Sequence, residues 1–288
     1  MPEIDLHTHS TASDGTYTPT ELVELAVKTE LKAMALTDHD TTGGLDEALE
    51  AARNTQLELI PGCELSVIYP GTMHIVGLWV KPDAPVLNKA LKELRDKRHN
   101  RNRIIVDKLA SLGIDITYDE VRDLAGEASV GRPHLARVLI DKKVVGTMQQ
   151  AFDKYLGPTG RAYVPKDKLT PEKAIELLKR EQATVILAHP FSLNLDEKTL
   201  RRELQRLKSI GLDGMEVYYS EHGPERIKRY KKICEEFDLL ISGGSDFHGS
   251  VKPYIRLGYG KGNLNIPCSL LEAMKKQRRE QGLPVPNA

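Results

Sequence analysis

The sequence predicts an α/β protein in which short buried strands alternate with helices. Six short apolar runs have the length of buried strands, and helical patterns separate most of them. The predicted strands are residues 3–7, 33–37, 57–62, 184–188, 214–219 and 239–244. Alternation of this kind favours a mostly parallel sheet, either open or closed into a barrel.

Start and stop signals support the helices between these strands. Pro19 lies in the first turn of a helix that begins at Thr18 or Thr20. Thr170 followed by Pro171 opens another helix, with a partial capping box. The other predicted helices are 44–54, 197–211, which ends at a glycine, and 224–237.

The middle of the chain has a different pattern. Residues 83–161 contain no convincing buried strand and show helical patterns instead. The predicted helices are 88–113, 119–126, 132–144 and 147–157. We therefore expect an all-helical insertion at 83–161 that covers the active face as a lid, within a β/α domain formed by 1–82 and 162–288.

Composition excludes several classes of protein. The 288 residues include 41 Lys and Arg and 41 Asp and Glu, so no global basic field exists to bind duplex DNA. Cys63, Cys234 and Cys268 form neither a zinc motif nor an evident disulfide framework. No leader and no apolar stretch of ~18 residues is present, so we expect a cytoplasmic protein without a membrane partner.

Histidines and carboxylates gather where the predicted strands end, and this is the strongest signal in the sequence. The carboxyl ends of parallel strands meet on one face, where active sites form. Imidazole and carboxylate groups without thiolates suit Zn, Mn or Fe(II). The candidate ligands are His7, His9, Asp14, His39, Glu64, His74, His189, Asp246 and His248. At about three protein ligands per catalytic metal, they suffice for about three ions.

His74 is an exception because it begins an apolar run instead of ending one. The residues YPGT at 69–72 read as a turn, so a hairpin would return the next strand in the antiparallel direction. The start of that strand would then lie beside Glu64. Asp5 and Asp38 are expected to orient ligands from behind.

These residues resemble the PHP (polymerase and histidinol phosphatase) family. The matching segments, besides the His74 strand, are DLHTHSTASDGT at 5–16, LTDHDT at 36–41, GCELS at 62–66, AHP at 188–190 and GGSDFH at 243–248. The resemblance implies a distorted (β/α)₇ TIM-like barrel with a trinuclear centre. Manganese is the expected metal, and iron and zinc are alternatives.

The resemblance also implies roles for the ligands. It assigns His7, His9, Glu64 and Asp246 to the first metal. It assigns Glu64, His74 and His189 to the second metal, which makes Glu64 the bridge. It assigns Asp14, His39 and His248 to the third metal. Glu64, His189 and Asp246 are the candidate catalytic residues.

Two further segments resemble a nucleotide-specific subgroup of this family. They are GRPHLAR at 131–137, within the insertion, and KYLGPTGRAYVP at 154–165, at its end. The members of this subgroup are 3′,5′-nucleoside bisphosphate phosphatases and 5′–3′ exoribonucleases that act on short RNA. This implies hydrolysis of nucleotide phosphomonoesters by hydroxide that bound metal makes available at neutral pH. The candidate substrate-binding residues are Arg132, His134, Arg161, Lys166 and His222.

Three alternatives stay open at this point. A histidinol-phosphate phosphatase would share the metal site, although the GRPH segment points away from it. An amidohydrolase would use a modified lysine where Glu64 stands. A non-catalytic PHP module of a replication polymerase belongs to another class of function.

Overall fold

The computed structural model describes residues 2–125, 130–165 and 167–285. The chain divides into two compact units. The barrel unit comprises Met1–Lys89 and Leu169–Ala288, and the helical unit comprises Ala90–Lys168. The helical unit thus begins and ends about seven residues later than the insertion expected at 83–161.

The barrel unit is built on a seven-stranded, nearly closed sheet, which confirms the predicted fold class. The strands follow one another in chain order. They are β1 (Ile4–Thr8), β2 (Ala33–Leu36), β3 (Glu58–Ser66), β4 (His74–Leu78), β5 (Thr184–Leu187), β6 (Gly214–Tyr219) and β7 (Leu240–Gly244). Only β4 runs against its neighbours, so the hairpin predicted at His74 is confirmed. All other pairs among the described strands are parallel.

The first and last strands meet at a seam that closes the barrel. The Asp246 amide donates to the His7 carbonyl at 2.9 Å, and the His9 amide donates to the Phe247 carbonyl at 2.9 Å. A Cβ atom at Gly244 would lie 2.2 Å from the His7 Cβ, so only glycine permits this approach. The seam therefore brings the ends of β1 and β7 together.

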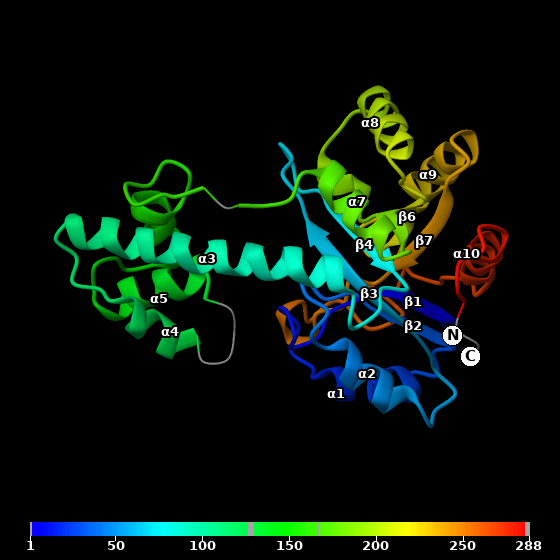
Figure 1. Cartoon of the computed structure of the whole chain (residues 1–288), viewed down its shortest axis with the longest axis horizontal. Coiled ribbons are helices and arrows are strands. Elements are labelled where there is room, and N and C mark those ends of the chain that lie inside the picture. The colour runs from blue at the N-terminus through cyan, green and yellow to red at the C-terminus, as the bar shows by residue number, and fades with distance from the viewer. Residues whose placement is uncertain (1, 126–129, 166, 286–288) are drawn as a thin grey trace. The chain divides into compact units, whose positions relative to one another are not determined.

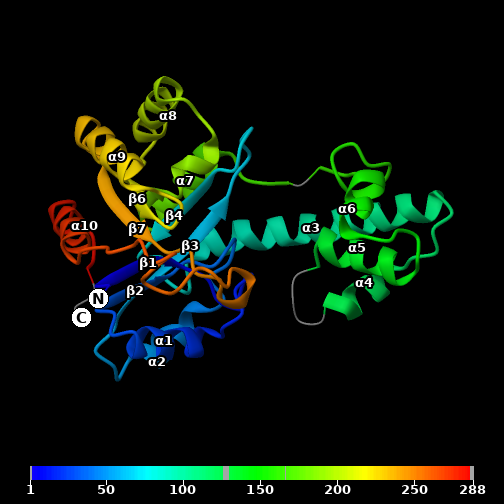
Figure 2. The ribbon, with the colours of Figure 1, turned by 180° about the vertical axis from the view of Figure 1, so that it is seen from behind.

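Helices pack around the outside of the barrel (Figures 1 and 2). They are α1 (Pro19–Lys28), α2 (Leu45–Ala52), α7 (Pro171–Arg180), α8 (Glu197–Ser209), α9 (Pro224–Glu236) and α10 (Ser269–Glu280). The Thr18 hydroxyl accepts from the Glu21 amide at 3.2 Å, and the Glu21 carboxylate accepts from the Thr18 amide at 2.8 Å. This capping box fixes the start of α1 at Thr18. The sequence patterns did not predict α10.

The helical unit contains no strand among its described residues. Its helices are α3 (Pro85–Ser111), α4 (Tyr118–Ala125), α5 (Arg132–Asp141), α6 (Met148–Ala151) and a π-helical turn at Phe152–Leu156. Aliphatic side chains such as Leu109, Leu135 and Leu139 form its core. The first turn of α3 belongs to the barrel unit, because Glu181 accepts hydrogen bonds from the amides of Val86 and Leu87. This explains why the helical unit begins later than expected.

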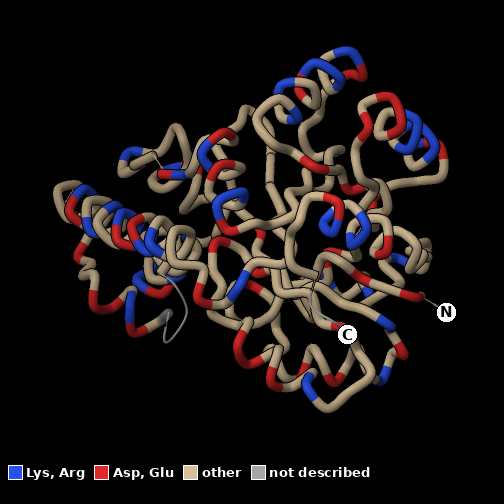
Figure 3. Tube along the Cα trace, turned by 45° about the vertical axis from the view of Figure 1, so that its right-hand side comes forward, with Lys and Arg blue, Asp and Glu red and all other residues tan. Residues whose placement is uncertain are grey.

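The distribution of charged residues and the state of the cysteines agree with what the composition predicts. Lys and Arg are interspersed with Asp and Glu along the trace (Figure 3). The three cysteines are free thiols, and burial raises the pKa of Cys234 to about 12. Within the described ranges, every helix is too short or too polar to cross a membrane.

Candidate metal centre

Strand ends position most of the predicted ligands. His7 lies in β1 and His9 directly after it, whereas Asp246 and His248 follow β7. The expectation that Glu64 follows its strand is wrong. β3 continues to Ser66 because its last residues pair with β4, with Glu64 opposite Val76 and Ser66 opposite His74.

The carboxylate of Glu64 lies at the centre of the cluster and is fully buried. Its Oε1 is 3.0 Å from His74 Nδ1 and 3.0 Å from His189 Nε2. Its Oε2 is 3.3 Å from the Nε2 atoms of His7 and His9 and 3.0 Å from His39 Nδ1. Five histidines from four separate segments thus meet at one carboxylate, as a bridging ligand requires.

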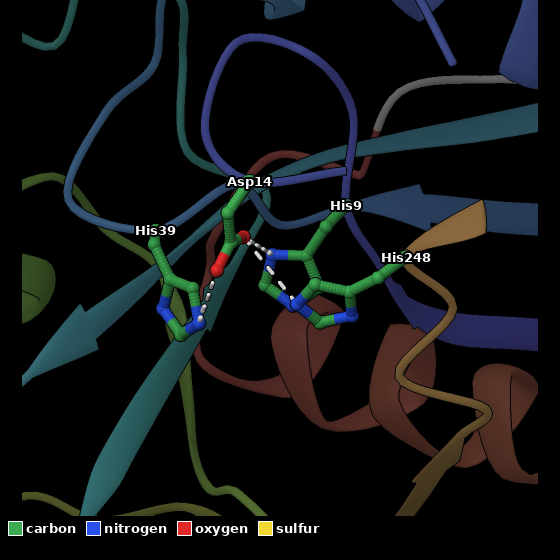
Figure 4. Close-up of side chains that lie close together, drawn as sticks. All are labelled: His9, Asp14, His39 and His248. Carbon is green, nitrogen blue, oxygen red and sulfur yellow. Dashed lines mark ion pairs between the residues drawn. The ribbon is translucent and has the colours of Figure 1, made fainter. Parts of the chain in front are cut away.

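Two further carboxylates complete the cluster. Asp246 Oδ1 lies 3.7 Å from His7 Nε2, 3.3 Å from His9 Nε2 and 3.4 Å from His248 Nδ1. Asp14 is more exposed and lies between three rings, which Figure 4 shows. Its oxygens are 3.3 Å from His248 Nε2, 3.8 Å from His9 Nδ1 and 4.0 Å from His39 Nε2. All nine candidate ligands therefore converge.

The nitrogen and oxygen atoms of the candidate ligands are arranged for binding a metal ion and not for hydrogen bonding with one another. Several are buried and have no hydrogen-bond partner among the described residues, although they lie close together. They are His7 Nε2, both ring nitrogens of His9, His39 Nδ1 and Glu64 Oε2. Buried polar atoms are normally hydrogen-bonded, so this concentration of unpaired atoms indicates a site for an ion.

The ligand atoms form three overlapping groups, each within 4.8 Å. The groups are His9, Asp14, His39 and His248; then His7, His9 and Asp246; then His39, Glu64 and His74. His9 and His39 each belong to two groups, a sharing that the family pattern did not assign. His189 stands outside these groups but contacts Glu64.

The electrostatics of the cluster follow from burial and opposite charges. Burial alone would raise the pKa of Glu64, but the nearby His39 and His7 hold that pKa well below its usual range. Burial opposes protonation of His9, yet the carboxylates of Asp246 and Glu64 raise the pKa of His9 to about 9. The carboxylates therefore stay ionised, as metal ligands must be.

A second layer of carboxylates holds the ligands in place. Glu216 Oε1 lies 3.1 Å from His7 Nδ1, and its Oε2 accepts the His189 amide at 2.6 Å. Asp5 accepts from the Ser245 amide at 2.8 Å and from the His7 amide at 3.4 Å. Sequence reasoning missed Glu216, although a carboxylate inside the apolar strand GMEVYY was the available signal.

Asp38 supports the loop that carries Asp14. It accepts from the Ser10 amide at 2.8 Å and the Ser10 hydroxyl at 2.6 Å. It also accepts from the Ser13 hydroxyl at 2.5 Å. Asp38 therefore fixes the loop at whose end Asp14 faces the histidines.

Two ligands occupy unusual backbone conformations. His189 has a φ of 28° and Asp246 a φ of 58°, both in the left-handed region. Residues other than glycine are uncommon there, and such conformations concentrate at functional sites. Each lies two residues beyond the end of a strand, β5 for His189 and β7 for Asp246, so the turn aims their side chains across the barrel end.

A cavity of about 210 Å³ opens beside the cluster. His39, His74, His189 and Asp246 face it, together with Tyr219 and Lys252. The Tyr219 hydroxyl donates to Asp246 Oδ2 at 2.8 Å, and Lys252 Nζ lies 2.6 Å from the same oxygen. No sequence pattern singled out Tyr219 or Lys252.

The predicted substrate-binding residues differ in their contacts and in their exposure. Arg132 donates to the Leu156 carbonyl at 3.1 Å and lies over the Tyr163 ring. His134 accepts the Gly131 amide at 3.1 Å and so helps to begin α5. Arg161 is exposed. Lys166 lies outside the described residues.

His222, which was predicted as a substrate-binding residue, is buried. Its Nδ1 lies 2.8 Å from the Val217 carbonyl, and Phe191, Tyr219 and Tyr230 surround its ring. Burial lowers the pKa of His222 to about 4. The ring is therefore neutral at physiological pH.

Arg101 is a neighbour of Arg132 that sequence reasoning missed. It is 5% exposed and contacts the Asn102 side chain at 2.8 Å. Burial lowers the pKa of Arg101, and the positive charges of Arg132 and Arg98 lower it further. The helical unit thus contains its own concentration of positive charge.

A barrel with histidines and carboxylates clustered at its strand ends defines a metal-dependent hydrolase. The PHP domain model matches residues 5–187. A 5′–3′ exoribonuclease from Haemophilus influenzae is 39% identical and covers 94% of this chain and 98% of its own length. A 3′,5′-nucleoside bisphosphate phosphatase from Chromobacterium violaceum is 34% identical, with 86% and 88% covered.

A solved structure from Bifidobacterium adolescentis, described as that of a metal-dependent phosphoesterase, superimposes with a TM-score of 0.76. It is 30% identical and covers 96% of both chains. The chain belongs to the PHP domain family, and it is a phosphoric ester hydrolase.

Proposed function

We propose that this protein removes the 3′-phosphate from nucleoside 3′,5′-bisphosphates and leaves the nucleoside 5′-monophosphate. The convergence of five histidines on the buried carboxylate of Glu64 carries this proposal. Similarity to a bisphosphate phosphatase supports the nucleotide part of the substrate. Short 5′-phosphorylated RNA is the second candidate, because an exoribonuclease is 39% identical to this chain.

We propose three divalent ions, with Mn²⁺ as the first to test and Fe or Zn as alternatives. Nine ligands in three groups of atoms support that number. When bound, such ions supply a nucleophile at neutral pH and offset the charge of the phosphoryl group. The proposed ligands are His7, His9, Asp14, His39, Glu64, His74, His189, Asp246 and His248.

The reaction itself needs few groups from the chain. A water oxygen forms a bond to phosphorus, the ester P–O bond breaks, and the leaving alcohol takes a proton. His189 and Asp246 are our candidates for moving that proton, because both face the cavity. The Ser192 hydroxyl, 2.9 Å from His189 Nδ1, holds the His189 ring in orientation.

Arg132 remains our candidate for binding a second phosphate, together with His134, Arg161 and Lys166. A guanidinium can bind a phosphate through two parallel hydrogen bonds. The buried Arg101 beside it adds positive charge that an anion would offset. The role of Arg132 in binding a second phosphate stays a prediction, and so does the role of the helical unit as a lid.

The test is a substrate panel with Mn²⁺-loaded protein. It comprises a nucleoside 3′,5′-bisphosphate, a 5′-phosphorylated oligoribonucleotide and histidinol phosphate. We expect the bisphosphate to have the highest kcat/KM. Preferred hydrolysis of histidinol phosphate would replace our proposal with that alternative, and no hydrolysis of any substrate would indicate a non-catalytic module.

Arg132→Ala tests the second-phosphate site, with Arg137→Ala as its matched control. Arg137 is on the same helix and pairs with Asp141 at the surface. We expect Arg132→Ala to lower kcat/KM on the bisphosphate by about 10- to 100-fold and to change hydrolysis of a simple aryl phosphate little. Equal losses on both substrates would contradict the role.

A further inference from the structure

The two oxygens of Asp246 have different surroundings. Oδ1 faces the rings of His7, His9 and His248. Oδ2 faces away from that group and contacts the Tyr219 hydroxyl at 2.8 Å and Lys252 Nζ at 2.6 Å. One oxygen is therefore available to a metal while the other is held by two donors.

Lys252 differs from the other residues around the cavity. Among the described lining residues it is the one lysine or arginine. It follows a short 3₁₀ turn at Gly249–Val251, directly after the ligand His248, and its side chain is 32% exposed. A partly exposed ammonium group at this position can contact the cavity contents without leaving Asp246.

The second donor on Asp246 makes Lys252 available to a ligand. Because the Tyr219 hydroxyl also donates to Oδ2, Lys252 can turn some of its N–H groups toward an anion while it stays beside Asp246. An ammonium group carries three N–H donors and acts as a mobile point charge, so it can contact Asp246 and a second oxygen together. The cavity offers a phosphoryl group no other lysine or arginine within its described lining.

We propose that Lys252 binds an oxygen of the phosphoryl group undergoing hydrolysis while it remains paired with Asp246. In this role it is a substrate-binding residue of the reaction, with a charge independent of the metal ions. The inference rests on the proposed phosphoester hydrolysis at this site but not on the nucleotide part of the substrate.

The competing explanation is that Lys252 only neutralises and positions Asp246. Metal content and phosphate binding separate the two roles. We would prepare Lys252→Met, Lys252→Arg and the control Lys261→Met, which removes a surface lysine paired with Glu221. For each Mn²⁺-loaded protein, calorimetry measures the Kd of inorganic phosphate, and elemental analysis measures bound metal.

We expect Lys252→Met to keep its metal but to bind inorganic phosphate at least about tenfold more weakly. We expect it to lower kcat/KM on an aryl phosphate by about 100-fold. Lys252→Arg should keep most of the phosphate affinity, and Lys261→Met should match the wild type.

Two results would overturn the inference: unchanged phosphate affinity in Lys252→Met, or weaker phosphate binding that only accompanies metal loss. The aryl phosphate separates this outcome from failure of the proposed function. The wild type could hydrolyse the aryl phosphate faster than Lys252→Met does and yet hydrolyse no nucleotide. That result would disprove only the nucleotide assignment.

Discussion

The carboxylate oxygen Oε1 of Glu64 lies 3.0 Å from Nδ1 of His74. Antiparallel pairing of β3 with β4 produces this contact, because it sets Ser66 opposite His74 and Glu64 opposite Val76. Side chains two residues apart on a strand point to the same face. Glu64 and His74 therefore share the face on which the cluster forms.

Glu64→Gln should remove the centre of the metal site. An amide cannot provide the charge that five histidines surround. We expect the variant to lose bound metal. We also expect its kcat to fall more than ~100-fold, because residues that only support a ligand typically cost ten- to hundredfold. Elemental analysis and steady-state kinetics measure both, and Glu58→Gln, at the opposite end of β3, is the control.

Glu216→Gln tests the layer behind the ligands. Glu216 contacts His7 Nδ1 and the His189 amide, so the variant should loosen two ligands without removing either. We expect metal affinity to fall about 10- to 100-fold in a chelator competition. Glu225→Gln, at an exposed position on α9, should have no effect. Similar metal affinity in both variants would contradict the role of Glu216.

Metal removal should lower thermal stability as well as activity. Buried donor atoms without partners are stabilised when an ion binds only the folded state. At a free metal concentration 100-fold above Kd, this linkage contributes about 2.7 kcal/mol. We expect chelator to lower the Tm by several degrees and Mn²⁺ to restore it. A Tm of Glu64→Gln that responds to Mn²⁺ as the wild type does would argue against the site.

Gly244→Ala should separate the two strands at the barrel seam. The added Cβ would lie 2.2 Å from the His7 Cβ, so β1 and β7 must move apart. We expect a loss of about 1–3 kcal/mol in the free energy of unfolding, together with lower metal content. Gly223→Ala is the control, since its added Cβ meets nothing within 4 Å. Urea titration and elemental analysis measure both.

His222 should make stability depend on pH. Burial lowers its pKa to about 4 in the folded protein, against about 6.5 when exposed. Between these values the unfolded chain binds the extra proton, so the free energy of unfolding falls as the pH is lowered from about 6.5 to about 4. Removing this group should reduce the loss by up to ~3 kcal/mol.

Urea titrations of chelator-treated protein at pH 7 and pH 4.5 measure this effect. His222→Phe should lose less free energy of unfolding between the two pH values than the wild type. His99→Phe, an exposed position on α3, should behave like the wild type. Equal pH dependence in His222→Phe and the wild type would show that His222 does not titrate as its burial requires.

Much of the fold could be predicted because its signals are local. The six predicted apolar runs all became strands. Thr18, one of the two predicted starts, begins α1, and Thr170 begins α7 as expected. The helix α10 was missed because no strand follows it to give a β/α pattern. The end of β3 was misplaced because pairing with β4, rather than its own apolar run, sets its length.

The sequence by itself determined the family, the barrel class and the residue types at the strand ends. These follow from short motifs and from period-two and helical patterns, which neighbouring residues carry. Only the tertiary structure decided that Glu216 supports His7, that Lys252 meets Asp246 and that His222 is buried. Closure of the barrel brings β7 beside β1 across more than 200 residues, and no local pattern encodes that contact.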